Sequence, residues 1–182
     1  WQAGGYMEVS DPIGTSGTTS PIFLNCPNHY ALQCAGQGNI RATYDKFWFR
    51  SYALYAQGTY KLTPQLSITA GARYTWDSTR QTNSTVAITF PTPFVPLYSC
   101  ANTARVANAN GSPVILPSLD PSRCLLEFKT RSKKPTWLID LEYKPTEDML
   151  LYAKWARGYR KGGVAILNPF FETWQPEKVD LY

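Results

Sequence analysis

Residues 66–77, LSITAGARYTWD, alternate strictly between two kinds of side chain. Every second residue from Leu66 to Trp76 is apolar or aromatic, whereas the residues between them are small or polar. Successive side chains of a β-strand point to opposite faces of its sheet, so the segment is predicted to be a strand with one apolar face. The alternation alone does not decide whether that face meets a protein core, a partner or lipid.

The same period of two recurs in residues 47–62, 128–144 and 149–163. The short turn sequences TPQ (63–65) and PTED (145–148) join these segments into two hairpins. Each expected strand has about 14 residues, against a mean of about 5–6 in soluble proteins. No helical period competes with this pattern, so the chain is predicted to be all-β.

The segments between the hairpins are polar and rich in Pro, Asn, Ser and Gly, which predicts loops. The expected layout is a loop at 6–46, a hairpin at 47–81, a loop at 82–127, a hairpin at 128–163, a loop at 164–175 and the start of a strand at 176–182. Short turns therefore lie at one end of the strands and long loops at the other.

The cysteines lie in these loops, and we predict the disulfides Cys26–Cys34 and Cys100–Cys124. Each pair lies within one turn-rich segment, and a single histidine, His29, gives no zinc-site spacing. The alternative is that the four thiols are unrelated. If the pairing is correct, the loops occupy an oxidising space, either the periplasm or the cell exterior.

Composition excludes some classes of protein. The net charge is +5, but the cations are scattered and form no continuous basic stripe, which makes nucleic acid an unexpected partner. No apolar run of about 18 residues is present, so no transmembrane helix is expected. Barrel strands alternate and give no such run, so a membrane barrel remains open.

Three features favour lipid over a soluble core. Strands of about 9–11 residues, tilted by about 45°, span a bilayer, and these are long enough. Short turns on one side and long loops on the other are typical of outer-membrane barrels, where the turns are periplasmic and the loops extracellular. Tyr52 and Tyr60 lie eight residues apart on one face, roughly 20 Å in height after tilt, close to the apolar band of about 25 Å.

The expected membrane girdle consists of Tyr52, Tyr60, Tyr74, Trp76, Trp137, Tyr143, Trp155 and Tyr159. Arg157 shares a face with two of these residues. We expect it to lie at the interface with its charge reaching water, or the register to slip there. The predicted fold is thus a segment of a transmembrane antiparallel up-and-down β-barrel. About five strands cannot close a barrel, which needs about 8 or more, so we expect a piece of a larger barrel, cut at both ends.

Two segments carry a resemblance to a known family. Residues 51–80 (SYALYAQGTYKLTPQLSITAGARYTWDSTR) and 141–164 (LEYKPTEDMLLYAKWARGYRKGGV) resemble successive hairpins of the TonB-dependent receptors of the Gram-negative outer membrane. PEKVDLY resembles the start of the next strand, and the loops resemble nothing specific. The resemblance implies five strands of a 22-stranded barrel filled by a plug domain that is absent from this chain.

The resemblance also implies an activity. It implies that extracellular loops capture a scarce small molecule, foremost a ferric siderophore, with cobalamin or an oligosaccharide as alternatives. The inner-membrane TonB complex then pulls on the plug, so that the partners are the plug, the rest of the barrel, TonB, outer-membrane lipid or lipopolysaccharide and the ligand. The implied protein is a transporter, not an enzyme, and needs no cofactor. A passive porin and a secreted β-sandwich binding module are the competing interpretations.

No constellation of catalytic or metal-ligating residues stands out. The residues expected to face the lumen are Arg73, Asp77, Asp140, Glu142, Tyr152, Lys154 and Arg160. We expect their charges to pair with one another or with the plug, in preference to attracting an anionic ligand or performing acid–base chemistry. The candidate ligand contacts are loop residues suited to stacking or cation–π contact: His29, Tyr30, Tyr44, Tyr98 and Arg105.

Overall fold

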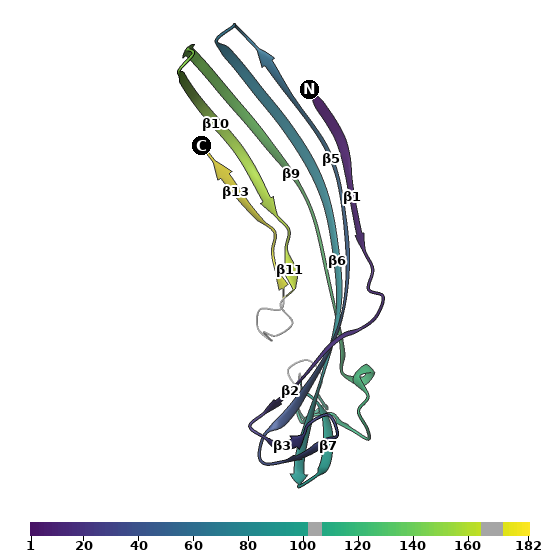
Figure 1. Cartoon of the computed structure of the whole chain (residues 1–182). Coiled ribbons are helices and arrows are strands. Elements are labelled where there is room, and N and C mark those ends of the chain that lie inside the picture. Colours follow the sequence, from purple (N-terminus) through teal and green to yellow (C-terminus); the bar gives the residue numbers. More distant parts are fainter. Residues whose placement is uncertain (102–106, 165–172) are drawn as a thin grey trace.

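The chain folds into one long, bowed antiparallel sheet that carries a small folded region at one end (Figure 1). The computed structural model describes residues 1–101, 107–164 and 173–182. The main path of the sheet follows the order β1 (Gln2–Ser10), β5 (Asn39–Lys61), β6 (Leu66–Thr92), β9 (Leu125–Thr146), β10 (Met149–Arg160) and β13 (Glu177–Leu181). Neighbours in this path are sequential and antiparallel, as the sequence predicts for an up-and-down wall.

Both predicted hairpins are present, with short turns at one end of the sheet (Figure 1). β5 and β6 pair without a register shift from Lys61↔Ser67 to Asn39↔Thr89. The hydroxyl oxygen of Thr63 accepts hydrogen bonds from the backbone N–H groups of Gln65 (3.2 Å) and Leu66 (3.0 Å), which fixes the β5–β6 turn. A threonine that bonds its own following backbone is a recognised turn former, so TPQ acts through that side chain.

The prediction of irregular loops at 6–46 and 82–127 is wrong in large part. β5 and β6 have 23 and 27 residues and continue well beyond the expected strand ends, whereas β9, with 22 residues, exceeds its expected range only slightly. The outer half of β6 is rich in Thr, Ser and Asn on both faces, and this polarity suggests a loop although β-branched residues favour strands. The remaining elements in these regions are β2 (Ser16–Ile22), β3 (Asn25–Asn28), β4 (Gln33–Ala35), β7 (Val95–Cys100), β8 (Ile115–Leu116) and the 3₁₀ helix η1 (Pro121–Cys124).

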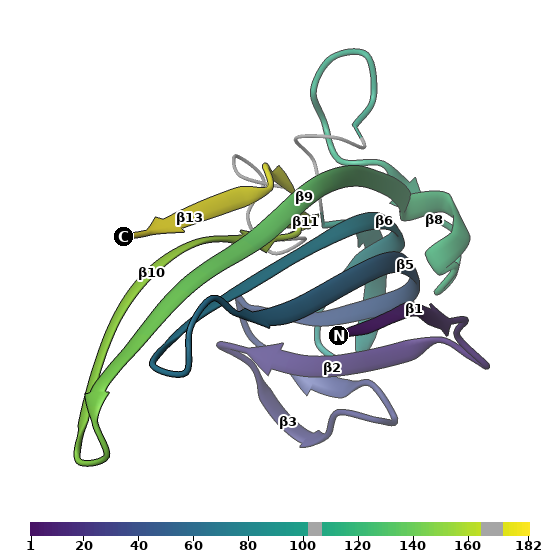
Figure 2. The same ribbon diagram turned by 90° about the horizontal axis from the view of Figure 1, so that it is seen from above.

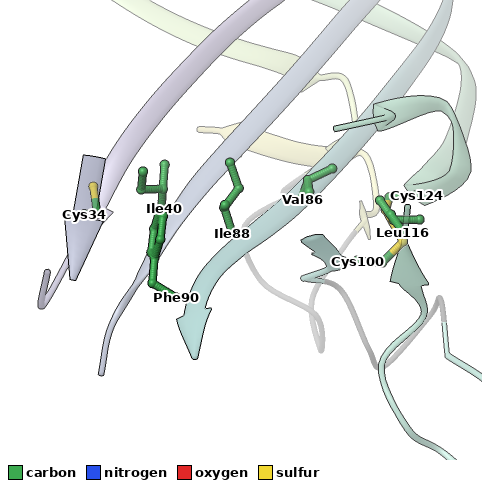
Figure 3. Packing of buried hydrophobic residues seen from close by; sticks show 8 residues of the cluster. All are labelled: Cys34, Ile40, Val86, Ile88, Phe90, Cys100, Leu116 and Cys124. Atoms are coloured by element: carbon green, nitrogen blue, oxygen red, sulfur yellow. A yellow bond between two sulfur atoms is a disulfide. The ribbon is translucent and has the colours of Figure 1, made fainter. Parts of the chain in front are cut away.

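The buried hydrophobic core lies at this outer end and not along the wall (Figure 3). Ile40 of β5 and Ile88 of β6 are cross-strand partners and are almost fully buried. Leu116 of β8 and the half-cystines of both predicted disulfides pack into the same cluster. The pairs Cys26–Cys34 and Cys100–Cys124 are confirmed, with Cα–Cα distances of 4.2 Å and 5.3 Å.

The two disulfide-bonded regions are joined through the backbone. The N–H of Phe94, in the turn between β6 and β7, donates to the carbonyl of Cys34 in β4 (3.0 Å). The short pair β11 (Gly163–Val164) and β12 (Thr173–Trp174) follows β10, and residues 165–172 of the expected loop lie outside the described residues. Within the part of the chain that the structure describes, no helix is long and apolar enough to cross a membrane.

Candidate functional site

The two faces of the wall differ sharply in chemistry. Cross-strand partners point to the same face, so the continuous register assigns each residue to one of two surfaces. One row of partners is Tyr60, Ile68, Leu141 and Ala153, and the neighbouring row toward the turn contains Leu66, Tyr143 and Leu151. Tyr60 is 70% exposed and Leu54, on the same face, is 64% exposed. A contiguous apolar face left uncovered across four strands is atypical of a soluble monomer.

Seven of the aromatic residues expected in the girdle lie on this apolar face: Tyr52, Tyr60, Tyr74, Trp76, Trp137, Tyr143 and Trp155. The rings of Tyr74 and Trp76 are tilted against each other with centroids 4.6 Å apart. Trp137 and Trp155 meet edge to face at 6.0 Å. Their position on the uncovered face agrees with the predicted placement, while their depth in a membrane stays a prediction.

Arg157 is the one guanidinium among these aromatic residues, and its charge is matched. Its Nη2 donates to Oδ2 of Asp180 in β13 (2.8 Å), and Nε bonds the other carboxylate oxygen. The guanidinium carbon also lies 4.1 Å from the centre of the Trp137 ring. The arginine is thus paired within the sheet, which differs from the expectation that its charge reaches water.

The opposite face is polar and forms the inner side of the bow. Side chains from β10 and the residue after it reach across this face to strands that are not their neighbours in the sheet. The Tyr159 hydroxyl donates to Oδ2 of Asp77 in β6 (2.9 Å) and also bonds Ser132 of β9. The Lys161 ammonium lies 3.2 Å from the centre of the Phe49 ring in β5. These contacts reach across non-adjacent strands, so the polar face is the concave side of the bow, while its position in the lumen of a barrel stays a prediction.

The prediction that Tyr159 belongs to the lipid-facing girdle is therefore wrong. The alternation places it with Trp155, but the pairing of β9 with β10 ends at Trp137↔Arg157. Beyond that point β10 leaves β9, and Figure 1 shows the two strands diverging. The Tyr159 hydroxyl consequently turns to the polar face, where Asp77 is only 9% exposed. No register slip occurs at Arg157: the pairing with β9 ends there, and the pairing with β13 continues in register from Ala156↔Leu181 to Arg160↔Glu177.

Six of the seven expected lumen residues, all except Arg160, lie on the polar face, but they do not all pair as expected. Arg160 directly follows Tyr159 and therefore points to the other side of the sheet. Arg73 donates to the Thr75 hydroxyl (3.0 Å) and lies over the Tyr6 ring of β1 at 5.2 Å. Lys154 is the direct cross-strand partner of Asp140, yet no ion pair joins them among the described residues. Asp140 Oδ1 is buried without a hydrogen-bond partner in the described part of the chain.

Arg160 pairs with a residue that the sequence did not single out. Its Nη1 lies 3.8 Å from Oε2 of Glu177 in β13, and both side chains are well exposed. Glu142 and Tyr152 are cross-strand partners near the β9–β10 turn. The lumen set is thus spread along the strands and forms no compact catalytic group. No cluster of His, Cys, Asp and Glu suited to a metal ion occurs among the described residues.

The candidate ligand residues of the outer end are not gathered into one site. His29 and Tyr30 stack at 3.9 Å at the tip of the β3–β4 hairpin, where Tyr30 is 83% exposed. Tyr98 instead packs against the buried core, beside its cross-strand partner Ile88. The Tyr44 ring lies over Gly17 of β2, and a Cβ at that glycine would come within 3.4 Å of it. Arg105 lies outside the described residues.

Two exposed aromatic residues at the outer end were missed by sequence reasoning. Phe23 and Phe94 have positive φ angles of 55° and 64°, an unusual conformation for bulky residues, and both rings are exposed. Each lies in a turn next to the Cys34 strand. The prolines on both sides of each phenylalanine signal a turn but not which side chain the turn displays.

A wall of long antiparallel strands with an uncovered apolar face, a polar concave face and a folded region at one end is a segment of a β-barrel (Figure 2). The family model described as TonB dependent receptor-like, beta-barrel, matches residues 4–178. The chain therefore belongs to that family, whose members are outer-membrane receptors and transporters with a plug domain and a TonB partner. No match was found among curated proteins or among solved structures.

Proposed function

We propose that this chain forms part of the wall and outer surface of an outer-membrane receptor for energy-coupled uptake of a scarce ligand, foremost a ferric siderophore. The proposal rests on one observation in a chain of this family: the wall has an uncovered apolar face opposite a polar concave face. Such a wall suits lipid outside and a plug inside. Cobalamin and oligosaccharides are the alternative ligands.

The outer end supports ligand capture. Both disulfides hold its strands around one core, and exposed rings such as Tyr30, Phe23 and Phe94 project from its turns. Aromatic surfaces bind flat ligands such as catecholates by stacking. The net charge of +5 favours the approach of an anionic iron complex. These features support a siderophore without selecting its chemical type.

The lumen face supports a plug partner. Asp140 has a buried carboxylate oxygen without a partner among the described residues, and buried polar atoms of this kind are rarely left unpaired in native proteins. Lys154 and Glu142 expose further charges on the same face. We expect the plug to supply donors to Asp140, and TonB to act on the plug and not on this wall.

The test is uptake by the full-length receptor. Cells that carry it as their sole candidate importer are given radiolabelled iron as a panel of catecholate and hydroxamate siderophores, with and without TonB. We expect TonB-dependent uptake of one class and saturation at nanomolar to micromolar concentration. Uptake that proceeds equally without TonB, together with ion conductance in planar bilayers, would instead establish the passive porin. Absence of uptake for every siderophore while labelled cobalamin or an oligosaccharide enters redirects the ligand class.

The uncovered apolar wall weighs against the secreted β-sandwich. A sandwich buries its apolar faces against a second sheet. Fractionation of cells that express the full-length receptor should place it in the outer membrane, and recovery in the soluble fraction would support the sandwich.

A further inference from the structure

The loop between β7 and β8 contains an asparagine whose side chain is open to attack by the neighbouring backbone. Asn110 is followed by Gly111, and this is the single Asn-Gly pair in the sequence. Both residues are exposed in the part of the loop that leads into β8, and this part projects away from the sheet (Figure 2). Because glycine has no side chain to shield its own backbone nitrogen, that nitrogen can approach the carboxamide of the preceding asparagine.

The residues around Asn110 form a tight turn that requires the glycine. The Gly111 N–H donates to the Asn108 carbonyl (2.8 Å), and the Asn108 N–H donates to the Ser112 carbonyl (2.9 Å). Gly111 has a φ of 78°, which a residue with a side chain rarely adopts. Apart from the two chain neighbours, no heavy atom of the described residues lies within 4 Å of the place that a Cβ of Gly111 would take. The space beside Gly111 is therefore open to water.

Two hydrogen-bond donors polarise the Asn110 carboxamide. Its Oδ1 accepts hydrogen bonds from the Ser112 hydroxyl (2.7 Å) and from the Ser112 N–H (3.1 Å). Asn108 Nδ2 in turn donates to the Ser112 hydroxyl oxygen (3.0 Å), which leaves the hydroxyl proton directed at Asn110. Donors on a carbonyl oxygen stabilise the negative charge that develops there when a nucleophile adds to the carbon. The turn therefore favours attack on the carboxamide carbon.

We propose that Asn110 is a site of spontaneous deamidation that is accelerated by the two Ser112 donors. The Gly111 nitrogen loses its proton to hydroxide from the solvent and attacks Cγ of Asn110, and the negative charge passes to Oδ1. The bond from Cγ to the side-chain nitrogen then breaks, and this nitrogen takes a proton from water and leaves as ammonia. Water opens the resulting cyclic imide at either carbonyl, which gives aspartate or isoaspartate. The net reaction consumes water and releases ammonia, without oxidation or reduction.

The hydrogen bond from Gly111 to Asn108 opposes this reaction, because its proton must leave before the nitrogen attacks. The bond lies in an exposed turn where water replaces it, so it slows the reaction by about fivefold and does not prevent it. Asn83 provides a contrast within the same chain. It also precedes a small residue, but it is 2% exposed, lies in the part of β6 that is paired on both sides and donates to Asp45 through Nδ2 (2.9 Å). We expect Asn83 to remain unconverted.

Conversion changes the outer end in two ways. It replaces a neutral carboxamide by a carboxylate, and isoaspartate also adds a methylene group to the main chain. The turn leads into Leu116, which is 2% exposed in the core of the outer end, so the longer main chain alters the connection to that core. Because ammonia is released, the conversion is irreversible, and the converted fraction increases with the time since the receptor was made.

The test follows the purified full-length receptor during incubation at neutral pH in water enriched in heavy oxygen. Peptides from timed digests are separated by chromatography, and mass spectrometry locates the incorporated oxygen. The wild type should convert at Asn110 and not at Asn83 or Asn108 in the same digests. Ser112→Ala, which removes the hydroxyl donor and keeps the backbone donor, should slow the conversion by about fivefold. Ser118→Ala, which removes an exposed hydroxyl beyond β8, should leave the rate unchanged.

Unfolding in urea separates the effect of the turn from that of the Asn-Gly pair. Without the turn, the wild type and Ser112→Ala should convert at nearly the same rate. A difference that persists undiminished in urea would overturn the inference, because the hydroxyl would then act without the folded turn.

Three further results would also overturn it: no conversion at Asn110 in the folded receptor, equal rates for the folded wild type and Ser112→Ala, or an equal slowing in Ser118→Ala. Heat-modifiable gel mobility verifies that each variant is folded. The readout involves no ligand and no uptake, so the result is independent of the proposed transport.

Discussion

Arg157 and Asp180 form a two-point ion pair on the face of the wall that also carries Trp137 and Trp155. Their side chains are 28% and 22% exposed, so both charges are largely withdrawn from solvent. An arginine on a lipid-facing surface is costly unless its charge is matched. β13 supplies that match, which gives this strand a role beyond extending the sheet.

The first prediction follows from this pair. Asp180→Asn in the full-length receptor should lower the free energy of unfolding by about 2 kcal/mol, because the Arg157 guanidinium is left without its counter-charge in a poorly hydrated place. Urea titration in detergent, followed by gel mobility, measures the change. Glu177→Gln removes the exposed partner of Arg160 and should cost less than about 0.5 kcal/mol. Equal effects of the two substitutions would contradict the special role of Asp180.

The second prediction concerns the two faces of one strand. Ala70 lies on the apolar face between Gly58 and Ile139, whereas its neighbour Thr69 lies on the polar face between Thr59 and Asp140. Ala70→Lys should destabilise the receptor in a bilayer by about 2–4 kcal/mol, the cost of a lysine near the membrane midplane. Thr69→Lys should cost far less, because the new cation meets water and Asp140. Stability in lipid vesicles measures both, and a reversed order would show that the faces are assigned wrongly.

The third prediction concerns pH at the outer end. Glu127 accepts a hydrogen bond from Lys129, and this bond, followed by the one from Arg80, lowers the pKa of its carboxyl group below the usual 4.5. A carboxyl group with a lowered folded-state pKa stabilises the fold above its unfolded pKa, and the contribution disappears as the pH falls through the folded value. The stability difference between wild type and Glu127→Gln should therefore be present at pH 7 and shrink as the pH falls below the usual carboxyl pKa of 4.5.

The measurement is a pair of urea titrations, at pH 7 and at a pH below 4, on both receptors. Asp148→Asn, in the β9–β10 turn at the opposite end of the sheet, serves as the control for a general loss of negative charge. A wild-type advantage that persists unchanged at low pH would contradict the assigned role of the Glu127 carboxylate.

How far the sequence predicts this structure depends on where side-chain chemistry alternates. Around Leu66–Trp76 every second residue is apolar, and the strand, its faces and its turn follow from period and turn chemistry alone. Around Asn83–Thr89 polar and β-branched residues occupy both faces, so a strand is mistaken for a loop. Val86 and Ile88 are buried in a cluster with Cys34, Cys100 and Leu116 from other strands, and no local pattern contains these tertiary contacts.

The site shows the same limit. Arg73 and Asp77 share the face that alternation predicts, because their strand is paired on both sides in register, while their exposure to a lumen stays a prediction. Tyr159 is misplaced because β10 separates from β9 after Arg157. The alternation of the sequence does not reveal where that pairing ends. Tyr98 was selected as a ligand contact for its ring, but its cross-strand neighbour Ile88 draws that ring into the core. Partner identity, and not residue type, decides each of these cases.

The fourth prediction concerns the disulfides of the outer end. In the chain-entropy account a bridge stabilises more when it closes a longer loop. Cys100–Cys124 spans a sequence separation of 24 and Cys26–Cys34 one of 8. Removing the first bridge by Cys100→Ala/Cys124→Ala should therefore cost about 3.5 kcal/mol, and removing the second by Cys26→Ala/Cys34→Ala about 2.5 kcal/mol. Both losses should act on the shared core of the outer end and leave the wall strands paired.

Limited proteolysis of the full-length receptor in nanodiscs separates these effects. Cleavage should increase at the outer end in both double variants, more in the Cys100→Ala/Cys124→Ala variant, while the hairpin turns at Thr63 and Pro145 keep wild-type protection. Because both bridges lie in one cluster with Ile40 and Ile88, loss of either should also expose the other to reductant. If each remaining bridge resists reduction as it does in the wild type, the two bridges stabilise separate units, and the single outer core inferred from their packing is refuted.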